Sequence, residues 1–245
     1  MPLPRAVFAL CLTLPACCLA TWPAAAIVGG ADTPPGGAVM VLNAVGGVCT
    51  GIVLAPDAVL TAGHCAAGPH ALRVHYRGTD GAPVLVEVAA RAVHPGYDPG
   101  AVAKRRRSID LALVRTAEPL PPRFAPATLG AAQARAGKSL TLAGYGASRP
   151  GDPRSTGTFR SVAVPVVEPY GPSGILLWLQ GSQGAGACQG DSGGPVTGAD
   201  GAVLAVSAWI GGACGGLTQA VRLGPQRDWL DRTLGGWGIT ARWTP

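Results

Sequence analysis

From residue 27 onward, short apolar runs alternate with glycine, proline and aspartate, and this pattern limits the fold more than any other feature. Many short strands separated by such turn residues are typical of an all-β sandwich or a pair of barrels. The strand-like runs are residues 39–42, 51–54, 72–76, 84–88, 111–114, 140–142, 162–164 and 203–206. A helix is expected at 226–234, because Leu230 and Leu234 share one helical face and Gly235 then ends it. The sequence therefore predicts an all-β chain that ends in a helix.

The beginning of the chain has the pattern of a secretion signal. An early positive charge precedes an apolar run over residues 6–20, and three alanines follow at 24–26. The run is too short to span a bilayer comfortably. We therefore expect residues 1–26 to be a signal peptide, cleaved after the last of these alanines or after Ala20. The mature protein should be secreted or periplasmic, with no membrane attachment. A lipoprotein signal is a weaker alternative, since Pro15 fits its pattern badly.

Removal of this leader leaves four of the seven cysteines. They are Cys49, Cys65, Cys188 and Cys214. An even number in an exported protein indicates two disulfides, although three pairings are possible. None of these cysteines has the C-x-x-C spacing of a zinc site, and the loop at 78–83 has too few acids for calcium. We expect no metal and no cofactor.

The net charge is +6, and the only dense cluster of basic residues is the run 104–107. Proteins that bind single-stranded nucleic acid interleave such charges with aromatic residues, and no aromatic residue interrupts this run. The run therefore predicts a solvated loop and no nucleic-acid partner.

Ser192 has the most specific chemical context in the chain. The glycines within 190–194 leave the backbone free to form a tight turn that points two N–H groups at one oxygen, as a nucleophilic serine requires. The segment also matches the G-x-S-x-G elbow of α/β-hydrolases, in which the histidine follows the serine. No histidine follows Ser192, so that alternative is excluded.

A serine nucleophile needs a base that titrates near neutrality, which indicates histidine. Of the four histidines, His64 ends a strand-like run beside Cys65. The others lie in turns or within a strand, at His70, His75 and His94. Asp110 opens an apolar run, where a carboxylate needs charged or hydrogen-bonding partners. Taken alone, His64 could be a surface or core histidine, and Asp110 an exposed residue at a strand start.

Four segments together resemble the trypsin-like (chymotrypsin-fold) serine proteases. They are Ile27-Val28-Gly29-Gly30, Thr61-Ala62-Gly63-His64-Cys65, Asp110-Leu111-Ala112-Leu113 and Gly190-Asp191-Ser192-Gly193-Gly194-Pro195. All four occur in the order of the family, and the resemblance covers nearly everything after residue 26. It implies one peptidase domain over 27–245, all-β, with two antiparallel six-stranded β-barrels. The first barrel should span about 27–122 and the second about 123–225, followed by the helix at 226–234.

The resemblance also implies the roles of the catalytic residues, in a cleft between the barrels. His64 takes the proton of Ser192 and later gives it to the leaving amine, while Asp110 holds the histidine tautomer. The N–H groups of Gly190 and Ser192 form the oxyanion hole. The expected activity is that of a secreted serine endopeptidase that hydrolyses peptide bonds through an acyl-enzyme.

In the family, a free amino group at the mature N-terminus pairs with the aspartate before the serine. In this chain the pair would be Ile27 and Asp191. Because Ile27 follows Ala26 rather than a basic residue, signal peptidase itself is expected to create the active N-terminus.

The family pattern pairs the cysteines as Cys49–Cys65 and Cys188–Cys214. A third bridge that is common in the family, just ahead of the nucleophile loop, has no cysteines here. The segment at 169–179 is therefore expected to be looser.

Cleavage after arginine or lysine requires an acid six residues before the serine, and that position is Gly186. The expected pocket residues are Gly186, Ala187, Gly211 and Gly216. A neutral, roomy pocket predicts a preference for large apolar side chains before the cleaved bond. The segment 207–209 has an extra residue relative to the family's Ser-Trp-Gly, which leaves the subsites beyond the first undefined.

The expected partners are protein or peptide substrates, and the protein is expected to be a monomer. The alternative function is a catalytically silent binding protein on the same fold, because a fold does not guarantee an activity.

Overall fold

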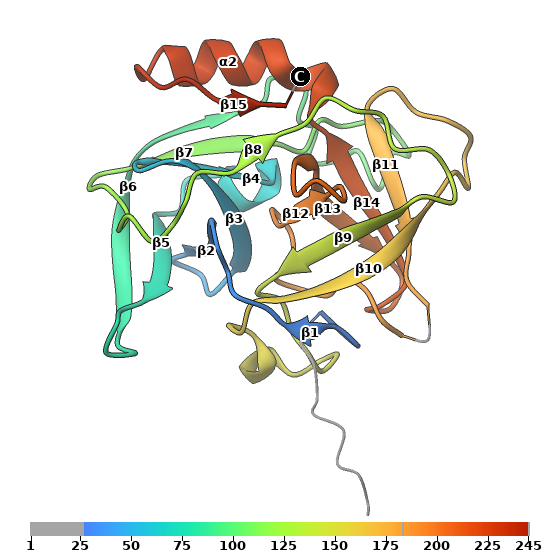
Figure 1. The fold of residues 1–245 in the computed structure, drawn as a ribbon, viewed down its shortest axis with the longest axis horizontal. Coiled ribbons are helices and arrows are strands. Elements are labelled where there is room, and N and C mark those ends of the chain that lie inside the picture. The colour runs from blue at the N-terminus through green and yellow to red at the C-terminus, as the bar shows by residue number, and fades with distance from the viewer. Residues whose placement is uncertain (1–26, 183, 245) are drawn as a thin grey trace, which may run out of the picture.

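The computed structural model describes residues 27–182 and 184–244, so the predicted signal peptide, residues 1–26, lies outside the described residues. Two groups of strands lie side by side, and a helix runs across one end of the molecule with the last strand beneath it (Figure 1). Each group contains a ring of six antiparallel strands. The predicted all-β fold with two six-stranded barrels and a C-terminal helix is therefore confirmed.

The first barrel closes in the order β2-β3-β4-β7-β6-β5. Its strands are β2 (Ala38–Asn43), β3 (Val48–Ala55), β4 (Ala58–Thr61), β5 (Leu72–Arg77), β6 (Pro83–Val93) and β7 (Ala112–Thr116). Successive residues of a strand point to opposite faces, so Val53 on β3 and Val59 on β4 fill the barrel interior. Ile52 and Leu60, their neighbours, face outward but are still buried. Burial on both faces explains why these strands are continuous apolar runs rather than alternating ones.

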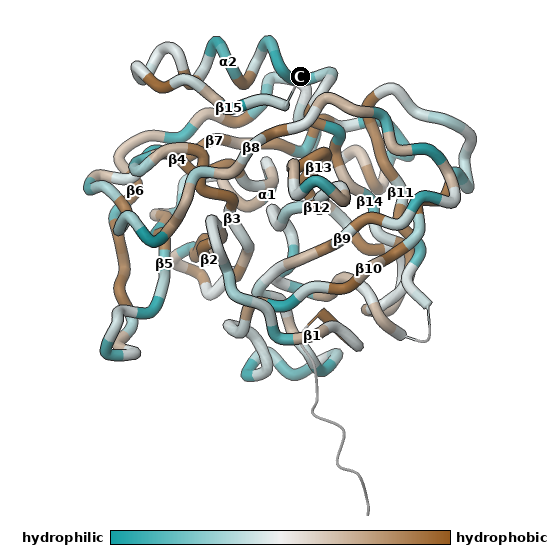
Figure 2. Tube along the Cα trace, viewed as in Figure 1, coloured by the Kyte–Doolittle hydropathy of each residue, from teal (hydrophilic) through white to brown (hydrophobic). Residues whose placement is uncertain are grey.

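The second barrel is also a closed ring, since β12 pairs with both β9 and β13. Its strands are β9 (Ser139–Gly144), β10 (Arg160–Val167), β11 (Leu176–Gln180), β12 (Pro195–Thr197), β13 (Val203–Gly211) and β14 (Leu217–Arg222). Two short strands, β8 (Thr128–Leu129) and β15 (Arg242–Trp243), extend this sheet by parallel pairing. Apolar residues are concentrated along the strands of both barrels and polar ones in the outer loops (Figure 2).

The two ends of the described chain connect the barrels. Strand β1 (Ala31–Asp32) pairs with β10, and Ile27 is fully buried in the core of the second barrel. The structure thus places residues 27–32 with the second barrel, whereas the sequence had assigned them to the first. Helix α2 (Arg227–Gly235) matches the predicted helix to within one residue at each end and follows the 3-10 turn η2 (Gly224–Gln226). Its Leu230 and Leu234 are buried in a cluster built from both barrels.

Among the described residues, no helix combines the length and the apolar character that crossing a membrane would require.

Candidate active site

His64 is held at the end of β4 by a short helix and a disulfide. Helix α1 (Gly63–Ala66) follows β4 after one residue, and Cys65 within it is bonded to Cys49 on β3. The predicted pairing is therefore present, with a Cα–Cα distance of 6.2 Å. The two cysteines are 16 residues apart in the sequence. Closing a loop of this size should stabilise the fold by about 3 kcal/mol. It also fixes the backbone on which the histidine depends.

Asp110 binds His64 twice. One carboxylate oxygen accepts the backbone N–H of His64 at 2.8 Å, and the other lies 2.7 Å from the ring Nδ1. The Asp110 side chain is 15% exposed and that of His64 is 38% exposed, so the pair is shielded on the aspartate side and open to solvent on the histidine side. A carboxylate at Nδ1 favours the tautomer that carries its proton there. Nε2 is then left as the base.

Ser192 lies on a glycine-rich turn that is fixed between the two barrels. Gly193 donates its N–H to Ser207 at 2.7 Å, and the carbonyl of Ser192 accepts the N–H of Thr50 at 2.8 Å. At Gly193 the φ angle is +86°, and a Cβ would lie 2.1 Å from the carbonyl oxygen of Thr50, so only glycine fits. The Ser192 hydroxyl donates a hydrogen bond to the carbonyl of Ala208 at 3.5 Å.

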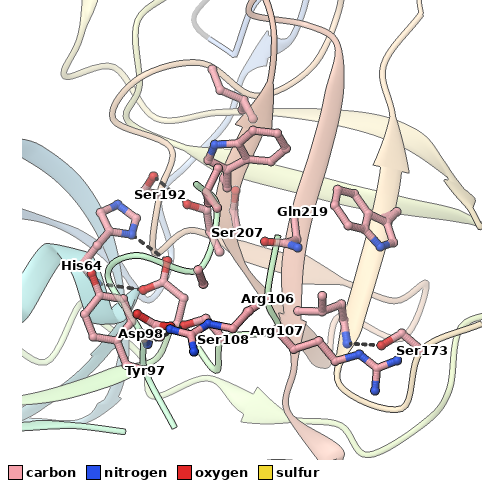
Figure 3. Close-up of a pocket in the computed structure, with 18 of the residues that line it drawn as sticks. His64, Tyr97, Asp98, Arg106, Arg107, Ser108, Ser173, Ser192, Ser207 and Gln219 are labelled. Carbon is pink, nitrogen blue, oxygen red and sulfur yellow. Dashed lines mark hydrogen bonds and ion pairs between the residues drawn. The ribbon is translucent and has the colours of Figure 1, made fainter. Parts of the chain in front are cut away.

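His64, Asp110 and Ser192 line one cleft of about 880 Å³. Figure 3 shows His64 and Ser192 at the same end of this cleft. His64 and Asp110 flank β4 and β7 of the first barrel, and Ser192 precedes β12 of the second. Residues far apart in the sequence are thus brought together by the packing of the barrels.

Thr50 is a site residue that the sequence reasoning missed. It is fully buried, and its hydroxyl donates to the carbonyl of Gly190 at 2.9 Å while accepting the N–H of Tyr145 at 3.0 Å. Together with its own N–H bond to Ser192, it holds the carbonyls of both residues that are expected to form the oxyanion hole. The signal was available: a hydroxyl inside the apolar run of β3 must find hydrogen-bond partners.

We expect Thr50→Val to lower kcat about tenfold with little change in KM, below the roughly 10²–10³-fold cost of losing an oxyanion donor itself. The isosteric change leaves the Gly190 carbonyl and the Tyr145 N–H without their partner, so stability should fall by about 1–3 kcal/mol as well. Thr50→Ser should restore kcat, and Thr141→Val on β9 should leave it unchanged. Steady-state kinetics and thermal unfolding check this. Equal kcat in the wild type and Thr50→Val would show that the hydroxyl does not position the loop.

Asp191 is fully buried beneath the oxyanion turn. Its two oxygens accept the N–H groups of Gly146 and Cys188, each at 2.8 Å. Burial raises the pKa of Asp191 to about 7, against the opposing effect of these two donors. Ile27 belongs to the same core cluster as Ala187, the neighbour of Cys188. Val28 forms a bridge with Gly186, so residues 27–28 pack against the segment that leads to Asp191. The ion pair between Ile27 and Asp191 stays a prediction.

The residues predicted for the substrate pocket do not themselves line the cleft within the part of the chain that the structure describes. Ala187 packs into the core of the second barrel, and Gly186 forms an isolated bridge with Val28. Within the described residues, the cleft lining includes Cys188, Gln189 and 207–210 but not Gly186, Ala187, Gly211 or Gly216. These residues adjoin the lining in sequence, and their contact with substrate remains a prediction.

The extra residue in the segment 207–209 is absorbed by a bulge. Ser207 pairs with Ala220 and Trp209 with Gln219, so Ala208 is the added residue in β13. The second disulfide, Cys188–Cys214, has the predicted pairing and a Cα–Cα distance of 4.5 Å.

One group of possible metal ligands lies at the site, formed by Cys49, His64 and Cys65 within 4.8 Å. Both cysteines are consumed by the disulfide, so they offer no thiolate, and this donor set does not fit zinc.

Comparison with known proteins agrees with this geometry. The family model described as Trypsin matches residues 27–230. Human Kallikrein-8 is 25% identical over 205 residues, which cover 78% of this chain and 78% of that protein. Human Serine protease 56 is 30% identical over 241 residues, covering 85% of this chain and 38% of the relative.

Solved structures show the same fold. Neuropsin, a serine protease expressed in the limbic system of mouse brain, has a TM-score of 0.71 at 20% identity, covering 84% of this chain and 99% of its own. Human heparin binding protein has a TM-score of 0.69 at 24% identity, covering 85% of this chain and 96% of its own.

Proposed function

The chain belongs to the trypsin-like serine protease family, and we propose that it is a catalytically active, secreted serine endopeptidase. The observation that carries this proposal is the cleft shared by His64, Asp110 and Ser192, in which both oxygens of Asp110 are committed to the histidine.

The proposed reaction begins with rotation of the Ser192 hydroxyl from the Ala208 carbonyl toward Nε2 of His64. As Ser192 attacks the substrate carbonyl, its proton passes to Nε2, and Asp110 stabilises the resulting imidazolium. The N–H groups of Gly190 and Ser192 stabilise the negative oxygen of the tetrahedral intermediate. The imidazolium then gives its proton to the departing amine. A water molecule then gives a proton to His64 and attacks the acyl-enzyme. The imidazolium returns that proton to the Ser192 oxygen as the bond to the acyl group breaks and the acid leaves.

The proposal is tested by exposing the mature protein to a fluorophosphonate and locating the adduct by mass spectrometry. We expect one adduct, on Ser192, and none in the Ser192→Ala variant. The alternative function, a catalytically silent binding protein, predicts no adduct in correctly processed wild-type protein, and that result would overturn the proposal.

We further propose cleavage after large apolar residues. The carboxylates that line the described cleft are Asp98 and Asp110, and each already has a cationic or histidine partner. A substrate arginine would find no free carboxylate there, whereas Trp209 and Ile210 offer apolar contact.

In a peptide library, kcat/KM for cleavage after phenylalanine or leucine should exceed that after arginine by roughly tenfold or more. The reason is that a neutral pocket has no carboxylate to offset the cost of removing a cation from water. Preferred cleavage after arginine would refute this specificity while leaving the peptidase proposal in place.

A further inference from the structure

The basic run is part of the active-site cleft and is not simply a solvated loop, so the expectation from sequence was incomplete. Arg105, Arg106 and Arg107 line the same cleft as His64 and Ser192, and Figure 3 shows Arg106 and Arg107 among the side chains that surround it. The sequence could not locate the run, because its position depends on how the loop between β6 and β7 folds back.

Internal contacts fix the base of this loop. The N–H of Asp98 donates to the hydroxyl of Ser108 at 2.8 Å, and the N–H of Ile109 donates to the carbonyl of Gly96 at 3.0 Å. Arg106 forms an ion pair with Asp98 at 2.7 Å. Arg106 therefore holds the loop in shape, and the arginines on either side of it are presented on a defined turn.

The cleft carries unneutralised positive charge. Its two carboxylates are both engaged, Asp98 by Arg106 and Asp110 by His64. Arg105 and Arg107 are exposed, and neither has an ion-pair partner within the part of the chain that the structure describes. Guanidinium groups bind carboxylates in bidentate geometry, so these two side chains suit acidic ligands.

The part of the cleft wall that β13 forms can hold an extended peptide. Strand β12 pairs with β13 only as far as Val206. Beyond Ser207, the segment 208–211 is paired with β14 on one side, and none of the described strands pairs with its other side. Trp209 and Ile210 of this segment line the cleft. An edge of this kind binds a peptide by adding a strand. A substrate peptide that adds antiparallel to β13, as β12 and β14 do, would place its cleaved bond at Ser192. The substrate residues before that bond would then lie beside 209–211.

An aromatic group completes this wall. Trp178 contacts Tyr170 edge-on with ring centroids 5.0 Å apart, and Trp209 with centroids 6.5 Å apart. All three residues line the same cleft as the arginine loop. The aromatic side suits the apolar parts of a substrate, and the arginine side suits its carboxylates.

We propose that Arg105 and Arg107 form a subsite for acidic side chains in the residues that precede the cleaved bond. The substrates are then acidic peptide segments followed by a large apolar residue. This inference rests on the proposed peptidase function and adds the charge of the substrate to it.

The test uses internally quenched peptides with phenylalanine before the cleaved bond and glutamate, glutamine or lysine at the three preceding positions. For the wild type, kcat/KM should be about tenfold higher for glutamate than for glutamine, and lower still for lysine. Added salt should reduce this ratio, because the arginines are exposed.

The Arg105→Gln/Arg107→Gln variant should cleave the glutamate and glutamine peptides equally. The matched control is Arg232→Gln/Arg242→Gln, which removes two exposed arginines outside the cleft lining. It should keep the wild-type ratio, which separates a local subsite from an effect of total charge.

Each other outcome counts against the inference in a distinguishable way. A wild type that reacts with fluorophosphonate but cleaves the glutamate and glutamine peptides equally overturns the acidic subsite and leaves the peptidase proposal intact. If, in addition, heparin binds the wild type and not the Arg105→Gln/Arg107→Gln variant, the arginines form a polyanion site instead. A wild type that neither labels nor cleaves overturns both proposals.

Discussion

Ser192→Ala, His64→Ala and the double variant should all lower kcat by the same factor, on the order of 10⁶. The serine and the histidine act as one unit, since His64 has no proton to accept without Ser192 and Ser192 is a poor nucleophile without the base. Removing the second residue therefore costs nothing further. The residual activity should come from the oxyanion donors and from substrate binding, which neither change removes.

The measurement is kcat on one peptide substrate, with far-ultraviolet circular dichroism to confirm that each variant is folded. Ser139→Ala and His70→Ala, at exposed positions, are the matched controls and should keep full activity. Independent, multiplying losses in the double variant would contradict a shared mechanism. Full activity in His64→Ala would show that another group serves as the base.

The second large effect concerns the amino end of the mature chain. A protein that retains residues 21–26, and the Asp191→Asn variant, should each lose at least roughly 10²–10³-fold in kcat/KM, the cost of a missing oxyanion donor. The reason is the burial of Asp191, which disfavours its charge. An ammonium group at Ile27 would compensate for that cost and fix the turn above it.

The pH dependence of stability gives an independent readout. Without the ammonium group, the pKa of Asp191 is raised to about 7 in the folded protein, so folding favours its protonated form. That contribution is present in full below the ordinary aspartate pKa and is lost as the pH rises through about 7. With the ammonium group, the pair should persist at neutral pH and be lost at high pH, when the amine deprotonates, or at low pH, when Asp191 is protonated.

Thermal unfolding between pH 4 and 8 should therefore show the extended protein losing stability with rising pH relative to the mature one. Parallel curves would contradict the pairing of Ile27 with Asp191. N-terminal sequencing of the exported protein tests the signal cleavage that is expected to expose the amino group of Ile27. A start at Ile27 is expected, and a start at Thr21 would show that a second protease is needed.

Much of the fold was predictable because its strands are strongly apolar. The continuous apolar segments that became β3 and β7 are buried on both faces, so their composition indicates strands directly. Of the barrel strands, β11, β12 and β14 were missed. The last of these, Leu217–Arg222, mixes polar and apolar residues, and β12 has three residues. Such segments become strands because neighbours pair with them, which local sequence does not record.

The sequence by itself determined the proposed chemistry: which serine, histidine and aspartate are assigned to it, in what order, and within which glycine-rich turn. Local constraints carry that information, because tight backbone geometry at Gly190 and Gly193 requires glycine. The tertiary structure alone decided that Thr50 holds the oxyanion turn, that Ala208 forms a bulge, and that the basic loop lines the cleft. Each of these depends on contacts between segments distant in the chain, whose distances are set by the packing of the two barrels.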